Sequence, residues 1–203
     1  MKEFWNERYS AKEYAYGELP NEYLVDKLSA LDAGKILFAA DGEGRNGVFA
    51  AKLGWDVTSF DISESGKMKA EILAEKNKVS IKYDIADLES IQYPIEKFNA
   101  IGLIYAHFHE NKRRSYHQKL DRLLQPGGYL ILEAFSKNHI DYNRINDKVG
   151  GPKDVDMLYS IDEIQHDFPN YTILELKETE LILNEGEFHR GKGSVIRFFG
   201  RKN

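Results

Sequence analysis

The 203-residue sequence contains no cysteine. Disulfides, thiolate metal sites and cysteine nucleophiles are therefore excluded. The sequence also has no apolar run near the roughly 20 residues that a membrane-spanning helix requires. Its first residues, MKEFWNERYS, lack the apolar core of a signal peptide. We expect a cytoplasmic protein with no membrane partner.

A surplus of positive charge is missing as well. The chain has 28 lysines and arginines against 33 aspartates and glutamates, which gives a net charge of −5. Binding to nucleic-acid phosphates needs a basic surface, so we expect no nucleic-acid partner. One basic stretch, NKRRSYHQK (111–119), is interpreted as the solvated face of a helix.

Strand-like and helix-like patterns alternate along the first two thirds of the chain. Short apolar runs predict buried parallel strands at 35–40, 55–61, 79–84, 99–108 and 129–135. Between them, helices are predicted at 20–31, 45–53, 63–77 and 112–124. This alternation predicts an α/β fold, a doubly wound parallel sheet covered by helices on both faces.

The last third of the chain follows a different pattern. Residues 136–158 are loop-like, and SIDE (160–163) is a capping box that opens a short helix. Two strand-like segments, 171–183 and 187–200, are joined by NEG and predict an antiparallel hairpin at the sheet edge. No linker is evident, so we expect one domain with an N-terminal cap (1–31), a core (34–135) and a C-terminal part (136–203).

A glycine-rich turn follows the first predicted strand, in ILFAADGEGRNG (36–47). Such a turn lets the chain leave the strand tightly and points backbone N–H groups at a polar ligand. Asp61, at the end of the second strand, is placed to bond ribose hydroxyls. These features fit either a nicotinamide dinucleotide or S-adenosylmethionine.

Three features favour S-adenosylmethionine. YDIADL (83–88) places Asp87 just after the third strand, where an acid can bond an adenine amino group, and Asp87 is better placed than Asp84. The chain has no room for the separate catalytic domain of most dehydrogenases, and Leu120 stands where the short-chain type needs a lysine after Tyr116. The third feature is the terminal hairpin after LLQPGGYLILE (123–133).

Taken together, these features resemble those of a class I S-adenosylmethionine-dependent methyltransferase, along almost the whole length of the chain. It is most similar to the small-molecule group of the tellurite-resistance and thiopurine methyltransferases. The segments that carry the resemblance are FWNERY, YGELPNEYL, ADGEGRNGVFAAKLGWDVTSFDIS, DIADL, LLQPGGYLILEAF and EGEFHRGKGSVIRF. The resemblance implies a Rossmann-like, seven-stranded, mostly parallel sheet with an antiparallel C-terminal hairpin. It also implies cofactor contacts at Ala40, Gly42, Asp61, Ile62, Asp87 and Leu88. We expect Gly44 and Tyr105 to belong to the same site.

Two positions depart from the pattern of that family. Ala40 stands where the family usually has glycine, and Phe38 stands where it often has an acid. The methyl group of Ala40 crowds the turn, and Phe38 removes a carboxylate that steadies the loop. Asp41 or Glu43 is a candidate to replace that carboxylate. Because of these departures, a cofactor-binding protein without catalysis is an alternative function. The glycine triplet Gly42, Gly44 and Gly47, read literally, leaves a nicotinamide-dependent oxidoreductase as a further alternative.

The N-terminal segment is rich in aromatic residues. Phe4, Trp5, Arg8, Tyr14 and Tyr16 are interpreted either as a lid over the cofactor or as a helix packed on the sheet. In the lid interpretation, Arg8 or Tyr16 meets the carboxylate of the cofactor.

Candidate acceptor residues come first from YAHFHE (105–110), at the end of the fourth strand. His107 is a candidate lining residue for the substrate, the alternative being a satisfied strand-end histidine. His107, His109 and Glu110 also suggest a metal site, but no further ligands are evident, so we expect no metal. The segment is not Asn/Asp-Pro-Pro-Tyr, which speaks against methylation of DNA bases.

The terminal hairpin supplies the candidate catalytic residues His189, Arg190 and Arg197. The tellurite-resistance relatives have a similar His-Arg pair and a later arginine, and the resemblance implies substrate handling here. Guanidinium groups suit an oxyanion or carboxylate, and His189 suits a base. Alternation places Arg190 on the opposite face, and an unbroken strand separates His189 from Arg197 by about 26 Å. Their convergence requires a bend at Gly191 or Gly193.

The sequence thus predicts transfer of a methyl group from S-adenosylmethionine to a small-molecule acceptor, by a monomer or a homodimer. Tyr142, Arg144 and Met157, in the segment 136–158, are placed to cover that acceptor. The acceptor remains open among selenite or tellurite, a thiol, and a small carboxylate or amine.

Overall fold

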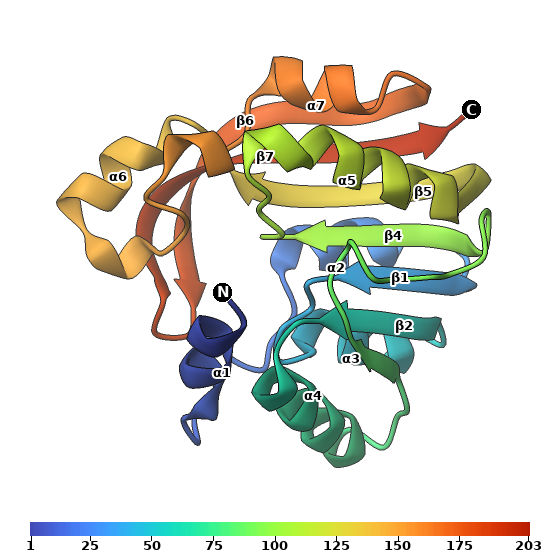
Figure 1. Cartoon of the computed structure of the whole chain (residues 1–203), viewed down its shortest axis with the longest axis horizontal. Coiled ribbons are helices and arrows are strands. Elements are labelled where there is room, and N and C mark those ends of the chain that lie inside the picture. Colours follow the sequence, from blue (N-terminus) through green and yellow to red (C-terminus); the bar gives the residue numbers. More distant parts are fainter.

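The computed structural model describes all 203 residues. Seven strands form one sheet in the order β3-β2-β1-β4-β5-β7-β6 (Figure 1). The first five strands are parallel, and β7 pairs antiparallel with both β5 and β6. The prediction of a mostly parallel, doubly wound sheet with an antiparallel C-terminal hairpin is confirmed.

The parallel half of the sheet follows the predicted alternation closely. Its elements are α2 (Glu22–Leu28), β1 (Lys35–Ala39), α3 (Arg45–Lys52), β2 (Asp56–Asp61), α4 (Glu64–Lys76), β3 (Lys82–Ile85), β4 (Phe98–Ile104), α5 (Glu110–Leu123) and β5 (Leu124–Phe135). Side-chain caps determine two of the helix starts: Asn21 accepts from the Leu24 N–H, and Ser63 accepts from the Gly66 N–H. The helix predicted from Pro20 therefore begins at Glu22.

The C-terminal part differs from its prediction in one respect. The segment predicted as a loop contains a helix, α6 (His139–Ile145), and two 3₁₀ turns, η1 (Asp147–Val149) and η2 (Val155–Met157). The capping box is present, with Ser160 and Glu163 bonded reciprocally at the start of α7 (Ile161–Asp167). Then β6 (Tyr171–Glu185) and β7 (His189–Lys202) form the hairpin.

The core lies on both faces of the sheet. Along β1, Ile36 and Phe38 pack on the face covered by α2 and α3, whereas Leu37 and Ala39 pack on the face covered by α5 and α7. Phe38 is fully buried, and a Cβ on Gly102 would lie 2.4 Å from its ring. Phe38 is therefore a core residue whose ring requires glycine on the neighbouring strand.

The N-terminal helix α1 (Lys2–Ser10) lies outside these layers and packs on α4. In Figure 1 the tip of the β6–β7 hairpin reaches down to the same region as α1. The Glu187 N–H donates to the Ala15 carbonyl at 3.0 Å, which joins the hairpin tip to the segment after α1. No helix in the structure has the length and apolar character needed to cross a bilayer.

Candidate functional site

The strand order reverses between β1 and β4: the chain continues from β1 toward β2 and β3 on one side, and from β4 toward β5 on the other. In open α/β sheets, ligands bind beyond the carboxyl ends of the strands at such a point. We call residues 40–44, 61–63 and 105–107, which follow β1, β2 and β4, the carboxyl edge. Two of its residues have left-handed backbone angles without being glycine, Ala40 (φ 55°) and Tyr105 (φ 53°). Strain of this kind concentrates at functional sites.

Ala40 gives a direct measure of that strain. A left-handed conformation costs an L-residue about 1–2 kcal/mol. Replacement by glycine removes this cost, but only part of it is gained as stability, because glycine also makes the unfolded chain more flexible. We expect Ala40→Gly to stabilise the protein by about 0.5–1 kcal/mol, measured by urea denaturation. Ala39→Gly is the matched control: it lies one residue earlier in β1, is buried, and is expected to destabilise. A loss of stability with Ala40→Gly contradicts the strain.

The glycines of the turn are required by close packing. Gly42 (φ 54°) and Gly44 (φ 80°) are also left-handed. A Cβ on Gly42 would lie 2.6 Å from the Tyr9 hydroxyl, and one on Gly44 would lie 2.4 Å from the Ala70 Cβ. The turn is thus pressed between α1 and α4.

Asp61 connects the glycine turn to the end of β2. One carboxylate oxygen accepts the Gly42 N–H at 3.1 Å, and the other accepts the Ser63 N–H at 2.9 Å. Burial raises the pKa of Asp61, while these N–H donors oppose the rise. Each oxygen keeps a second lone pair, so the carboxylate has capacity for two more donors, as a ribose diol supplies.

Asp41 and Glu43 both brace the turn, as the sequence suggested. Asp41 accepts from the Ser59 hydroxyl at 2.8 Å, and burial raises its pKa to about 7. Glu43 accepts from Lys69 at 2.6 Å and from the Ala15 N–H at 2.8 Å. Glu43 therefore ties the N-terminal segment to the glycine turn.

The predicted adenine-side residues follow β2 and β3. Asp87 is exposed and caps its own turn by accepting from the Ser90 N–H at 2.8 Å. The Ser90 hydroxyl first, and then the Ser90 N–H, hold the pKa of Asp87 below its usual range. Ile62 is half-buried, and Leu88 is buried in the core. Asp87 thus offers an accessible carboxylate beyond β3.

The N-terminal segment covers the turn through Tyr9, a residue that was not among the predicted site residues. Tyr9 is buried, and its ring stacks on Trp5 at 5.4 Å between centroids. The signal was present in the helical four-residue spacing from Trp5 to Tyr9. Arg8 donates to the Tyr16 hydroxyl at 3.3 Å, and its guanidinium lies 3.8 Å from the centre of the Phe188 ring.

His189 lies among aromatic side chains at the hairpin tip. Its ring centre is 4.5 Å from those of Tyr16 and Tyr105, and 5.2 Å from that of Phe135. Only 4% of His189 is exposed. Burial lowers its pKa, although a hydrogen bond to Glu185 opposes this. His189 is therefore neutral at pH 7.

The other two candidate catalytic residues do not reach His189. Arg190 is exposed and bonds its own hairpin turn, donating to the Gly186 carbonyl at 2.8 Å. Gly191 has a φ of 119°, but the pairing of β6 with β7 continues through it. Arg197 pairs across the sheet with Glu133 at 2.5 Å. The hairpin curves toward α1 (Figure 1), but Arg197 is paired with Glu133 and not with His189. Arg190 faces outward, as strand alternation predicts.

His107 has both ring nitrogens bonded to backbone. Its Nδ1 lies 2.9 Å from the Met157 carbonyl, and its Nε2 accepts the Phe135 N–H at 3.2 Å. Burial lowers its pKa to about 4. These bonds fix a neutral tautomer and favour the interpretation of His107 as a satisfied strand-end histidine. The structure contains no group of three or more metal-ligating side chains.

The residues predicted to cover the acceptor lie apart from one another. Tyr142 bonds Glu180, Arg144 is exposed and pairs with Asp141 at 2.9 Å, and Met157 is half-buried. They do not converge on one point.

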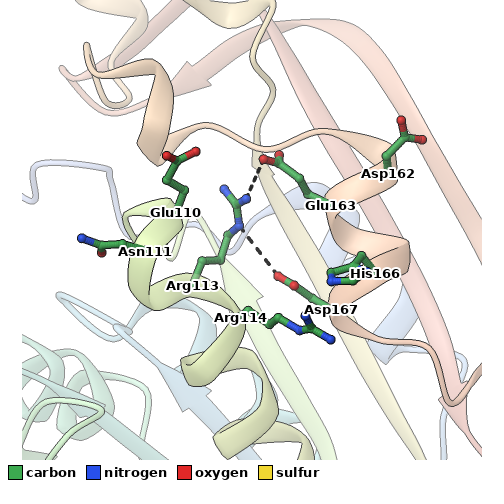
Figure 2. Close-up of a pocket in the computed structure, with 8 residues that line it drawn as sticks. All are labelled: Glu110, Asn111, Arg113, Arg114, Asp162, Glu163, His166 and Asp167. Carbon is green, nitrogen blue, oxygen red and sulfur yellow. Dashed lines mark ion pairs between the residues drawn. The ribbon is translucent and has the colours of Figure 1, made fainter.

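A separate cleft of about 560 Å³ opens between α5 and α7. Its lining residues are all polar or charged: Glu110, Asn111, Arg113, Arg114, Asp162, Glu163, His166 and Asp167. Figure 2 shows Arg113 pointing between two carboxylates, with Glu163 at 2.7 Å and Asp167 at 3.7 Å. Without apolar lining and with its buried arginine paired, this cleft does not suit a nucleoside.

The chain is similar to known proteins in both sequence and fold. Residues 38–132 match the family model described as "Methyltransferase domain". The chain is 25% identical over 187 residues to a probable S-adenosyl-L-methionine-dependent methyltransferase from Haemophilus influenzae, covering 91% of this chain and 60% of that protein. A structure reported for the conversion of a disulfide bond into a thioacetal group during echinomycin biosynthesis has a TM-score of 0.80 at 19% identity, covering 100% of this chain and 92% of the other.

The chain thus contains a segment that matches a methyltransferase domain, and it is similar in sequence and in fold to S-adenosylmethionine-dependent methyltransferases. The Haemophilus influenzae relative is TehB, whose crystal structure has a TM-score of 0.70 at 20% identity and covers 100% of this chain and 67% of that one. Our chain spans about 60% of the length of the curated TehB proteins it matches.

The residues present at the carboxyl edge fit this cofactor. Asp61 has free lone pairs for two hydroxyls, and the Tyr105 hydroxyl is buried without a hydrogen-bond partner. Burial first, and then the charge of Glu133, raise the pKa of Tyr105, which keeps it a neutral donor. The exposed Ala40 lies between them along the edge.

Proposed function

We propose that this protein transfers the methyl group of S-adenosylmethionine to a small-molecule acceptor. The observation that carries the proposal is the carboxyl edge, at the point where the strand order reverses. This edge contains the strained Ala40 and Tyr105, the glycine turn and Asp61. The aromatic enclosure of His189 lies next to it, since the Tyr105 ring contacts His189.

In this proposal the cofactor residues divide into three groups. Asp61 holds the ribose hydroxyls, and Asp87 holds the adenine amino group. The glycine turn with Ala40, Ile62, Leu88 and Tyr105 shapes the surface between them. Arg8 and Tyr16, joined by their hydrogen bond, take the methionine carboxylate as a lid residue pair.

The acceptor side is formed around His189. S-adenosylmethionine, when bound, supplies a methyl group already activated on sulfur. The protein therefore contributes alignment, exclusion of water and, where the acceptor is protonated, a base. The rings of Tyr16, Tyr105 and Phe135 exclude water, and His189 takes the proton. Arg190 and His107 take no part in this step, and Arg197 is linked to the His189 region only through Glu133.

Incubation with methyl-labelled S-adenosylmethionine tests the proposal. The acceptors to be offered separately are tellurite, selenite, 2-mercaptoethanol, and mixtures of small carboxylic acids and amines. We expect label in one of these acceptors and S-adenosylhomocysteine as the co-product. Binding of S-adenosylhomocysteine without label transfer to any acceptor would instead support a cofactor-binding protein without turnover. We further propose that residues 1–203 act as one cytoplasmic domain.

A further inference from the structure

Glu185 is a charged side chain that bonds the His189 ring. The Glu185 carboxylate lies 3.0 Å from His189 Nδ1, four residues away across the hairpin turn. The Nε2 atom of His189 forms no hydrogen bond within the protein. The sequence pattern indicates His189 as a candidate but not the acid that precedes the turn.

Three groups hold Glu185 ionised in a largely buried position. Arg45, at the start of α3, lies 3.1 Å from the same carboxylate oxygen that bonds His189. Asn21 donates to the other oxygen at 3.2 Å. Burial alone would raise the pKa of Glu185, but His189 and Arg45 outweigh it and lower that pKa to about 2.

Asn21 also links Glu185 to the buried Glu133. Its side-chain nitrogen lies 2.6 Å from Glu133, whose second oxygen receives Arg197. The same side chain caps α2 through its oxygen. A continuous chain of hydrogen bonds thus runs from Arg197 on β7, through β5 and the N-terminus of α2, to His189 at the hairpin tip. This arrangement fixes where the Glu185 carboxylate stands.

We propose that Glu185 is a positioning residue that holds His189 with its proton on Nδ1 and leaves Nε2 as the proton-accepting atom. The inference rests on the proposed function, because it assigns the orientation of its base. The acceptor atom would form a bond to the methyl carbon as the bond from that carbon to the sulfonium sulfur breaks, with the electron pair left on sulfur. The proton that the acceptor atom loses passes to Nε2. The resulting imidazolium is stabilised by the Glu185 carboxylate, and the proton leaves to water after turnover.

The test uses the full chain labelled with ¹⁵N-histidine and long-range ¹H–¹⁵N NMR of the imidazole rings. The His189 signal is assigned by its absence in His189→Asn. We expect the wild-type protein to show His189 as the single Nδ1–H tautomer. Glu185→Gln should mix the tautomers and lower the midpoint of His189 titration, because the carboxylate that favours its charged form is gone. Glu185→Asp, which keeps the charge, should restore most of the wild-type tautomer.

Glu187→Gln is the matched control, since Glu187 lies two residues away on the same tip, is exposed and pairs with Arg190. It should leave the His189 spectrum unchanged. With an acceptor found in the labelling assay, Glu185→Gln should lower kcat roughly 10²-fold or more with little change in KM. A wild-type tautomer and titration in folded Glu185→Gln would overturn the positioning role. Full methyl transfer by His189→Asn would instead overturn the base in the proposed function.

Discussion

Replacing Asp61 by alanine is expected to weaken binding of S-adenosylhomocysteine at least 100-fold. Two charge-assisted hydrogen bonds to ribose hydroxyls are lost, each worth about 1.5–3 kcal/mol, and about 1.4 kcal/mol corresponds to a tenfold change in affinity. The glycine turn also loses the carboxylate that accepts the Gly42 N–H. Isothermal titration calorimetry measures the change.

Asp56→Ala provides the control for Asp61→Ala. Asp56 is exposed at the opposite end of the same strand and should leave the affinity unchanged. Asp61→Asn, which preserves the size of the side chain, guards against unfolding, with circular dichroism to confirm the fold. Wild-type affinity in folded Asp61→Ala would show that this carboxylate does not hold the cofactor.

Replacing His189 by asparagine should lower the rate of methyl transfer roughly 10²–10⁴-fold. Asparagine keeps an N–H donor near the position of Nδ1 for Glu185 but has no atom at the position of Nε2. S-adenosylhomocysteine should bind the variant as well as it binds the wild type. In the wild type, the rate should fall as the pH drops through the lowered pKa of His189, because the protonated ring accepts no further proton.

His166→Asn is the control for this variant, since His166 is an exposed histidine on α7. It should show the wild-type rate at each pH tested. If His189→Asn transfers methyl groups at the wild-type rate and with the wild-type pH profile, then His189 is not the base.

The fold was predictable because its strands and helices have strong local signals. The buried strands read as apolar runs, and Ser63 and the 160–163 capping box marked two helix starts. The secondary structure of the segment 136–158 was harder to predict from the sequence. Its helix α6 is short, and its packing depends on residues far along the chain, as when His139 accepts the Ser194 N–H. Such long-range contacts leave no periodic signal.

The site was predictable only at positions where the local sequence alone explains the residue type, such as an acid at the end of a strand or a glycine in a tight turn. Asp61 and the turn glycines are of this kind. Arg197 is the opposite case, because the choice between His189 and Glu133 as its neighbour depends on the curvature of the hairpin. Glu185, Asn21 and Arg45 were missed for the same reason, since three separate segments bring them together.

A crystal structure of the protein with S-adenosylhomocysteine is the most direct test of the proposed cofactor site, in which the carboxyl edge binds a nucleoside sugar at Asp61 and an amino-acid tail beside the glycine turn. We expect both ribose hydroxyls within hydrogen-bond distance of the Asp61 carboxylate and the adenine beside Asp87. Density for the ligand elsewhere, or linked phosphates of a dinucleotide at the glycine turn, would contradict it.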